Sequence, residues 1–375
     1  MLGLGRRQME KMVIDRAFWR GRRVLLTGHT GFKGAWATLL LRVLGAEVCG
    51  FALPPEHDDG LFNVAGVADD LRHNIGDINH AAAMPPLFAS FRPEIVLHMA
   101  AQSLVRRSYL QPAETYRTNV MGTVHVLEAI RQVDSVRAAV IVSSDKCYEN
   151  AGLARGYVET DPLGGSDPYS SSKAGTELVT QSYRRSYFSE AAGPQVASAR
   201  AGNVIGGGDW CADRLVPDAI RAFRNTETLL IRNARSIRPW QHVLDPVLGY
   251  LQLAEALVKQ GQRFAEGWNF GPGPQSEVTV GEVADHLVRR WGAKAGWSRD
   301  TGEHPYEAAY LRLDCTKANT QLGWNPVLPL EQALDLTVEW YRHFNDRASM
   351  RDVTIAQINR VLETPSRSET TLRPS

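Results

Sequence analysis

Two short segments of the chain carry residue types that could move protons to and from a hydroxyl group. One segment is Ser144-Asp145-Lys146, and the other contains Tyr169 and Lys173. Tyr169 and Lys173 lie one turn apart on one face if their segment is helical, where an ammonium group lowers the pKa of a phenol from about 10 toward the working pH. Such a phenolate can take a proton from a sugar hydroxyl while hydride leaves the same carbon. The spacing Y-x-x-x-K alone is common by chance and also fits a solvated helix face.

The elements that must position these residues are predicted from the hydrophobic pattern. Apolar runs of strand length alternate with stretches of helical character through the first half of the chain, which indicates βα units and a parallel, doubly wound sheet. Ser166 or Asp167 can cap a helix that begins at Pro168 and carries the Tyr and Lys. The predicted fold class is therefore α/β, a Rossmann-type sheet with a smaller mixed C-terminal lobe, and ligands are expected at the carboxyl ends of the strands. The predicted strands cover 24–27, 47–53, 93–98 and 138–143, and the first predicted helix covers 35–44.

Three glycines with the spacing G-x-x-G-x-x-G follow the first predicted strand and precede the first helix. Without side chains, the backbone can turn sharply and approach a pyrophosphate, whose charge meets the free N–H groups at the helix N-terminus. His29 and Lys33 add basic groups here, which is unfavourable unless an anion binds. A tight turn with close helix packing is the alternative, but the flanking strand and helix are the context that the motif requires. The segment predicts dinucleotide contacts from Gly28, Thr30, Gly31, Phe32, Lys33 and Gly34.

The residues alone leave the choice between NAD and NADP open. Enzymes of this architecture that use NAD usually carry Asp or Glu at the end of the second strand to bind the ribose hydroxyls. The run 48–53 contains neither, Glu47 comes too early, and Glu56 follows two prolines. Asp77 could contact the adenine, or it could be a turn residue.

Composition argues against several classes of partner. The 42 Lys and Arg residues and 41 Asp and Glu residues leave a net charge of +1, which favours a small molecule over nucleic acid or a membrane surface. The four cysteines form no C-x-x-C pair and have no His at zinc-ligand spacing, so we expect neither a disulfide framework nor a metal site. No window approaches the roughly 18 to 20 apolar residues of a membrane span, and the N-terminus lacks the features of a signal peptide. We expect a cytoplasmic protein.

Together the motifs resemble the extended short-chain dehydrogenase/reductase family and, within it, the nucleotide-sugar 4,6-dehydratases, most closely the branch that acts on CDP-glucose. The matching segments are TGHTGFKGAW, HMAAQSLVRRSY, NVMGT, SSDKCYEN, DPYSSSK, RAGNVIGGGDW, RPWQHV, EGWNFGP, LDCTKA and LGW. By this resemblance Ser144, Tyr169 and Lys173 form the catalytic triad, and the cofactor is NAD. The resemblance also implies cofactor contacts from Asp77, Ile78, Ala100, Ala101, Gln102, Asn119, Tyr169 and Lys173.

The resemblance implies the reaction as well. Dehydratases of the family carry Asp after the strand-end Ser or Thr, whereas epimerases generally lack it, so Asp145 is the expected acid for the departing hydroxyl. Oxidation at C4 by Tyr169 and the nicotinamide acidifies the C5 proton, its loss with the C6 hydroxyl eliminates water, and hydride returns to C6. The expected reaction converts CDP-D-glucose to CDP-4-keto-6-deoxy-D-glucose. Where dehydratases acting on dTDP-glucose carry Glu, usually credited as the C5 base, this chain has Lys146. The base is therefore Lys146 or another group.

Substrate contacts are expected mainly from the second half of the chain. Arg238 matches the family position that binds the substrate diphosphate, for which a guanidinium fork is suited. Asn203 and Arg214 are further expected phosphate or sugar contacts, and Ser103 is expected near the nicotinamide or the sugar. His242 is expected to bind substrate, although a His before an apolar pair is as often a core residue.

The chain is expected to divide by role. Residues 1–20 are expected to form an N-terminal arm, 21–201 an NAD-binding domain, and 202–347 mainly a sugar-nucleotide-binding lobe with some segments returning to the first domain. Residues 348–375 are expected to be a tail with a disordered end. Relatives pair through two helices, so the resemblance implies a homodimer or homotetramer, acting in deoxysugar biosynthesis such as that of lipopolysaccharide O-antigen.

Two other functions fit the sequence less closely. A 4,6-dehydratase or 4-epimerase for another nucleotide sugar would share most of these motifs. A dinucleotide-binding regulator that lost catalysis would keep the fold, but such drift should have eroded Ser144, Asp145, Tyr169 or Lys173, and all are present.

Overall fold

A parallel sheet of seven strands forms the centre of the structure, a computed structural model that describes residues 14–292, 294–302 and 311–364. The strands of this sheet are β1 (Arg23–Thr27), β2 (Glu47–Ala52), β3 (Arg72–Ile75), β4 (Ile95–His98), β5 (Ala138–Val142), β6 (Gln195–Ala201) and β10 (Gly267–Phe270). Their order is β10-β6-β5-β4-β1-β2-β3, with every neighbouring pair parallel. The doubly wound α/β sheet predicted from the sequence is confirmed.

The central strands are apolar along their length because both faces of the sheet are covered. Successive side chains of a strand point to opposite faces, so Val24 and Leu26 of β1 join one hydrophobic core while Leu25 joins the other. All five residues of β5 are buried. This packing explains why the strands appear in the sequence as short continuous apolar runs.

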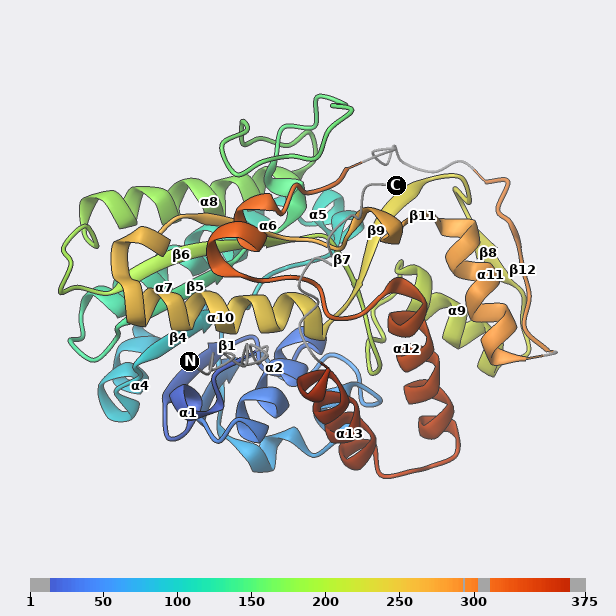
Figure 1. The fold of residues 1–375 in the computed structure, drawn as a ribbon, viewed down its shortest axis with the longest axis horizontal. Helices are drawn as coiled ribbons and strands as arrows, with labels where there is room; N and C mark the ends of the chain where they lie inside the picture. Colours follow the sequence, from blue (N-terminus) through green and yellow to red (C-terminus); the bar gives the residue numbers. More distant parts are fainter. Residues whose placement is uncertain (1–13, 293, 303–310, 365–375) are drawn as a thin grey trace, which may run out of the picture.

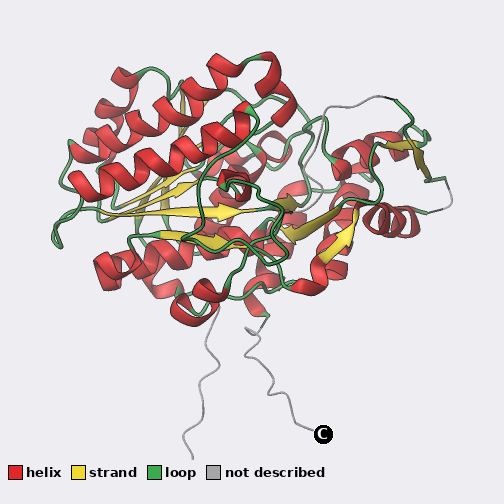
Figure 2. Ribbon diagram, turned by 90° about the horizontal axis from the view of Figure 1, so that it is seen from above, coloured by secondary structure: helices red, strands yellow, loops and turns green. Residues whose placement is uncertain are grey.

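Helices cover both faces of the sheet, as Figure 1 and Figure 2 show. The helices are α1 (Arg16–Trp19), α2 (Phe32–Val43), α3 (Leu61–Val64), α4 (Met84–Phe91), α5 (Val105–Leu110), α6 (Pro112–Tyr116), α7 (Gly122–Arg131), α8 (Pro168–Ser186), α9 (Leu215–Arg224), α10 (Leu244–Gln260), α11 (Val280–Trp291), α12 (Leu330–Asn345) and α13 (Met350–Glu363). Shorter turns of 3-10 or π helix are η1 (Val67–Asp70), η2 (Ala81–Ala83), η3 (Arg117–Met121), η4 (Asp145–Cys147), η5 (Gly261–Phe264), η6 (Pro274–Ser276) and η7 (Ala318–Leu322). Helices α2 and α10 pack on one face, and α4, α7 and α8 pack on the other.

A smaller lobe lies beside the sheet and is seen on the right of Figure 1 with α9, α11 and α12. It contains the strands β7 (Asn203–Ile205), β8 (Leu229–Ile231), β9 (Ile237–His242), β11 (Glu277–Thr279) and β12 (Trp297–Arg299). They form a three-stranded sheet of order β11-β9-β7 and a two-stranded sheet of β12 and β8. Between segments of this lobe, α10 packs against β5 and β6, and β10 joins the edge of the large sheet.

Both ends of the described chain are packed, which corrects part of the expected arm and tail. Trp19 in α1 has no exposed surface, so the chain is already anchored in the core before β1. Helix α13 buries Ile358 and Val361 and contacts α2 and α3, so residues 350–363 belong to the folded body. The remaining parts of the expected arm and tail, 1–13 and 365–375, lie outside the described residues.

None of the helices in the described ranges combines the length and apolar character needed to cross a membrane.

Candidate active site

A cavity of about 1470 Å³ runs along the carboxyl ends of the large sheet and beneath the smaller lobe. The loops after β1, β2, β4 and β5 all contribute to its wall, as expected for ligands at the switch point of a doubly wound sheet. The site residues expected from the sequence that line it are Gly28, Thr30, Gly31, Phe32, Lys33, Gly34, Asp77, Ile78, Ala100, Ala101, Gln102, Ser103, Ser144, Asp145, Lys146, Tyr169, Lys173, Asn203, Arg214 and Arg238.

The glycine turn brings β1, α2 and the loop after β4 close together. A Cβ atom at Gly28, where φ is +80°, would lie 2.7 Å from the backbone nitrogen of Ala100, and one at Gly34 would lie 2.1 Å from the carbonyl oxygen of Gly28. At Gly31 a Cβ would approach nothing closer than 3.5 Å. Gly31 is the N-cap of α2 and makes no side-chain cap hydrogen bond, so the helix N-terminus opens onto the cavity. This cradle fits a pyrophosphate.

His29 differs from its expected role as a charged group beside an anion. Its ring is completely buried, and its Nε2 lies 2.6 Å from Nδ1 of His73. Burial, with the neighbouring His73, lowers the pKa of His29 to about 4. His29 is therefore neutral near pH 7 and fills the space over Gly50, where a Cβ would lie 2.4 Å from the imidazole.

Lys33 extends from the glycine turn toward the catalytic residues. Its Nζ lies 5.8 Å from the ring centroid of Tyr250 on α10. Burial, together with the charges of Arg214 and Lys173, lowers the pKa of Lys33 to about 8, and Asp145 opposes the shift. The sequence suggested a phosphate contact for Lys33, and the structure also brings its charge near Asp145 and Lys173.

The loop after β2 forms the wall where an adenosine ribose is expected. Thr30 donates a hydrogen bond to the carbonyl oxygen of Leu53 at 2.8 Å, and Glu56 lies in the wall 3.7 Å from Arg107. Asp77 lines the cavity while its carboxylate also accepts the backbone N–H of Asn79 at 2.9 Å. Asp77 is thus both a turn residue and a cavity residue.

The first catalytic segment forms a short turn, η4, at the carboxyl end of β5. Ser144 caps this turn and donates a hydrogen bond to Asp145 at 2.9 Å. The Nζ of Lys146 lies 3.4 Å from the same carboxylate oxygen. Burial alone would lower the pKa of Lys146, but the charges of Asp145 and Tyr169 outweigh burial and raise it. Lys146 is therefore held as an ammonium group in this arrangement.

The second catalytic segment lies at the start of α8, as the sequence predicted. Asp167 accepts the backbone N–H of Ser170 at 2.9 Å and caps the helix. Burial raises the pKa of Tyr169, while the charge of Lys146 and a hydrogen bond with Ser144 act to lower it. The cation with the largest lowering effect is thus Lys146, whereas the sequence suggested Lys173.

Lys173 is also buried and follows Tyr169 by one turn of α8. Its Nζ lies 3.4 Å from the carbonyl oxygen of Val142, the last residue of β5. Burial lowers the pKa of Lys173 to about 8, and Cys147 and Glu177 oppose the shift.

Asn119 lies behind the cavity wall, so a direct cofactor contact does not fit its position. It is 2% exposed and receives the backbone N–H of Gln102 at 2.9 Å. Its amide donates to the carbonyl oxygen of Gln102 and to the hydroxyl of Ser172 on α8. Asn119 therefore holds the loop after β4 against α8.

The substrate residues expected in the lobe meet the loop after β4. The guanidinium group of Arg214 donates to Asp209 at 2.8 Å and to Ser103 at 3.0 Å. Arg238 and Asn203 lie in the same wall.

His242 corrects the expected set of substrate contacts, because it is a core residue. Its ring has no exposed surface and packs edge-on against Trp36 at 5.5 Å. Its Nδ1 accepts the backbone N–H of Leu244 at 3.3 Å. Burial lowers the pKa of His242 to about 3, so the ring is neutral.

Two groups near the site were missed by the sequence reasoning. Asp209, which is 3% exposed, fixes Arg214, and Glu177 with Arg200 forms a sealed ion pair beneath the catalytic residues. Glu177 follows Lys173 by one helical turn, and this spacing was the signal that could have identified it.

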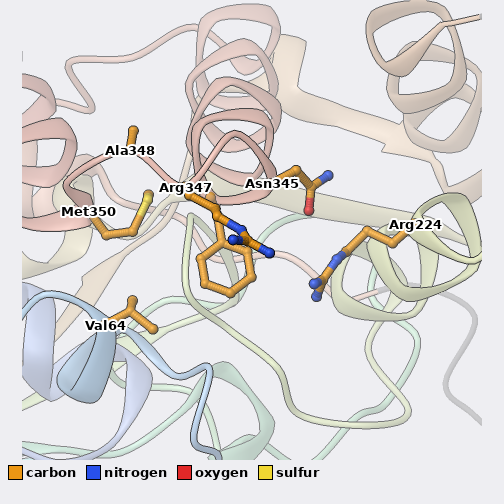
Figure 3. A pocket seen from close by; sticks show the side chains of 7 residues that line it. Val64, Arg224, Asn345, Arg347, Ala348 and Met350 are labelled. Carbon is orange, nitrogen blue, oxygen red and sulfur yellow. The ribbon is translucent and has the colours of Figure 1, made fainter.

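A second hollow of about 490 Å³ lies between α9 and the turn that joins α12 to α13, away from these residues. Figure 3 shows Arg347 near the centre of the view, with Arg224 to the right and Met350 and Val64 to the left. No residue expected from the sequence to bind a ligand lines it. Across residues 14–292, 294–302 and 311–364, no group of three or more His, Cys, Asp or Glu side chains could hold a metal ion.

Comparison with known proteins places the chain among nucleotide-sugar enzymes. The sequence model of the family described as GDP-mannose 4,6 dehydratase matches residues 25–337. The CDP-glucose 4,6-dehydratase of Salmonella typhimurium is 51% identical over 334 residues, covering 88% of this chain and 93% of that protein. The dTDP-glucose 4,6-dehydratase of Xanthomonas campestris pv. campestris strain B100 is 27% identical over 338 residues, covering 84% and 92%.

Among solved structures, the dTDP-glucose 4,6-dehydratase of Streptomyces venezuelae, solved with NAD bound, is similar with a TM-score of 0.72. It is 26% identical, and the match covers 87% of this chain and 98% of that one. The chain therefore belongs to the family described as GDP-mannose 4,6 dehydratase, a family of extended short-chain dehydrogenase/reductase type.

Proposed function

We propose that the protein is a nucleotide-sugar 4,6-dehydratase, a hydro-lyase that converts CDP-D-glucose to CDP-4-keto-6-deoxy-D-glucose and water with NAD as cofactor. The observation that carries this proposal is the meeting of an acid, a cation and a phenol in one cavity wall, at Asp145, Lys146 and Tyr169. The 51% identity to a CDP-glucose 4,6-dehydratase supports the choice of substrate.

The residues present fit the proposed cofactor. The glycine cradle and the open N-terminus of α2 would hold the pyrophosphate, and the wall at Thr30, Asp77 and Ile78 would hold the adenosine. When bound, NAD supplies the group that accepts hydride from C4 and returns it to C6. Lys173 and Tyr169 lie on the wall where the nicotinamide end would reach.

Tyr169 is the proposed base for the C4 hydroxyl. Its buried phenol loses a proton with difficulty, but Lys146 and Ser144 favour the phenolate. Transfer of the C4 hydroxyl proton to Tyr169, together with loss of the C4 hydride to the bound cofactor, would leave a ketone at C4 and make the C5 proton acidic.

Asp145 is the proposed acid for the elimination. It is 3% exposed, and one of its oxygens accepts from both Ser144 and Lys146 in the cavity wall. Protonation of the departing C6 hydroxyl turns it into water, and loss of the C5 proton completes the double bond. Because Lys146 is held as an ammonium group, it must first release a proton before it can serve as the C5 base.

The substrate diphosphate is proposed to contact Arg238 and Arg214, with Ser103 and Asn203 beside the sugar. Arg214 is held by hydrogen bonds to Asp209 and Ser103, and its positive charge interacts electrostatically with Tyr169. We also propose a cytoplasmic homodimer or homotetramer, and a product that enters deoxysugar biosynthesis such as that of lipopolysaccharide O-antigen.

An epimerase shares the fold, as the 24% identical UDP-glucose 4-epimerase of Thermotoga maritima illustrates with a TM-score of 0.72. Asp145 and its pairing with Lys146 favour a dehydratase, because an epimerase needs no acid for a leaving hydroxyl. The full set of Ser144, Asp145, Tyr169 and Lys173 in one wall argues against a non-catalytic regulator.

The proposal is tested by incubating the protein with CDP-, dTDP-, GDP- and UDP-glucose, with and without added NAD. We expect CDP-glucose to yield a 4-keto product that absorbs in base, and the other three to react more slowly. A change of configuration at C4 without loss of water would instead identify an epimerase. If none of the four substrates is converted at saturating NAD, the proposed function is wrong.

A further inference from the structure

A sealed cluster of polar side chains lies beneath the proposed catalytic residues. Glu177 on α8 is 3% exposed and its carboxylate receives three donors. Ser143 donates to one oxygen, and Ser198 at 2.6 Å and Arg200 at 2.8 Å donate to the other. Arg200 is 4% exposed and also donates to the hydroxyl of Tyr148 at 2.6 Å. The cluster therefore joins α8 to the end of β5 and to β6.

The position of Glu177 links this cluster to catalysis. Tyr169, Lys173 and Glu177 follow one another at intervals of one helical turn, so they share one face of α8. Lys173 contacts the carbonyl oxygen of Val142, and Glu177 contacts the next residue, Ser143. Because Ser144 and Asp145 follow directly, these two contacts set where the catalytic turn lies relative to Tyr169.

Glu177 is the carboxylate that interacts with the charge of Lys173. Lys33 on α2 and His98 on β4 each interact with the Lys173 charge, as do Cys147 in η4 and Glu177 on α8. Cys147 is buried, and burial holds the pKa of its thiol well above the usual value, so the thiol is uncharged. Glu177 is then the negative charge among these groups that favours the ammonium form of Lys173.

We propose that Glu177 is a positioning residue for the dehydratase reaction, holding the end of β5 against α8 and keeping a negative charge one helical turn below Lys173. Arg200 and Ser198 keep the carboxylate ionised and in place. This inference rests on the proposed function for its effect on turnover, but the contacts and charges exist in the protein without ligands.

The proposal predicts a change in pH dependence when the charge is removed. In Glu177→Gln the ammonium form of Lys173 loses its negative neighbour, so the pKa of Lys173 falls from about 8 by about one pH unit. Activity that requires a charged Lys173 then decreases from about pH 7 upward instead of about pH 8. The ratio of parent to variant kcat should be about fivefold at pH 8 and close to one at pH 6. A purely structural defect would lower kcat equally at both pH values.

The experiment measures both the titration and the turnover. Lysine labelled with ¹³C at Cε is followed by NMR from pH 6 to 10 in the cofactor-free protein, with the Lys173 signal identified by its loss in Lys173→Arg. The rate of keto-sugar formation from CDP-glucose is then measured across the same range. Ser198→Ala is the matched control, because it removes a neutral hydrogen bond to Glu177 and leaves the charge, so the Lys173 titration should stay where it is in the parent.

A second variant guards against failure to fold. Glu177→Gln combined with Arg200→Met removes both members of the ion pair, which proteins tolerate better than a single buried charge. Glu177 acts on the pKa of Lys173 more strongly than Arg200 does. The double variant should therefore still lower the pKa of Lys173, but by less than Glu177→Gln alone. An unchanged Lys173 titration in a folded variant lacking the Glu177 charge would overturn the proposal. If the parent itself fails to convert CDP-glucose, the proposed function fails, while the titration still tests Glu177.

Discussion

Two carboxylate–cation pairs lie close together around the end of β5, and they differ mainly in their access to the cavity. In the open pair, Asp145 and Lys146 are 3.4 Å apart with side-chain exposures of 5% and 35%. In the sealed pair, Glu177 and Arg200 are 2.8 Å apart with exposures of 3% and 5%. The open pair keeps its cation within reach of a ligand, whereas the sealed pair is surrounded by protein on both sides.

The surroundings of the two pairs differ as well. The oxygens of Glu177 are occupied by Ser143, Ser198 and Arg200, so its charge is fixed in place. Asp145 accepts from its two sequence neighbours, Ser144 and Lys146, through one carboxylate oxygen. The two pairs thus differ in the number of donors around the carboxylate, three at Glu177 and two at Asp145.

The largest expected effect is on the open pair. Asp145→Asn removes the proposed acid while keeping its size, so water loss should slow by about 10² to 10⁴-fold. Oxidation at C4 should persist, because Tyr169 remains, and reduced cofactor should accumulate during a single turnover monitored at the nicotinamide absorbance. Asp134→Asn, at an exposed ion pair with Arg92, is the control and should turn over as the parent does. Water loss at nearly the parental rate in Asp145→Asn would show that Asp145 is not the acid.

The sealed pair should respond in stability. Arg200→Met leaves the Glu177 carboxylate buried without its cation, which costs about 3 to 5 kcal/mol of unfolding free energy. Urea denaturation followed by circular dichroism measures this loss. Arg92→Met breaks an exposed pair with Asp134 and is the matched control, for which we expect no measurable change. Equal stability of the two variants would mean that enclosure does not set the strength of the pair.

Lys146→Met should have a smaller effect that depends on pH. Lys146 lowers the pKa of Tyr169 against the effect of burial, so its removal raises that pKa. Oxidation at C4 then needs a higher pH, and the rate at neutral pH should fall by about 3- to 10-fold and recover as the pH rises. Deuterium uptake at C5 from solvent should be followed in the same variant. Uptake at the parental rate would exclude Lys146 as the C5 base, and Lys317→Met, in an ion pair with Glu266, serves as the control.

The smallest effect is expected at His242. The ring of His242 lies in the core against Trp36 and lines no part of the cavity. His242→Gln should therefore change the KM for CDP-glucose by less than about twofold. Arg238→Lys, in the cavity wall, should raise the same KM by more, since a lysine cannot make the forked contact to a phosphate. A larger change in KM at His242 than at Arg238 would support the sequence-based prediction that His242 binds substrate.

Local patterns predicted a large part of this fold. The strand at 138–143, the helix that begins at Pro168 and the glycine turn between β1 and α2 all depend on neighbouring residues, and the structure confirms them. Burial was harder to predict. His29 and His242 look polar in the sequence, but packing from His73 and Trp36 makes them neutral core groups.

The sequence by itself determined the chemistry that is available, because the residue types and the i, i+4 spacing of Tyr169 and Lys173 depend only on local order. The tertiary structure decided which charges face one another. It placed Lys146 rather than Lys173 as the strongest cation acting on Tyr169, and it enclosed Glu177 between β5 and β6. These outcomes depend on distances between segments far apart in the chain, and electrostatic effects depend on those distances and on burial.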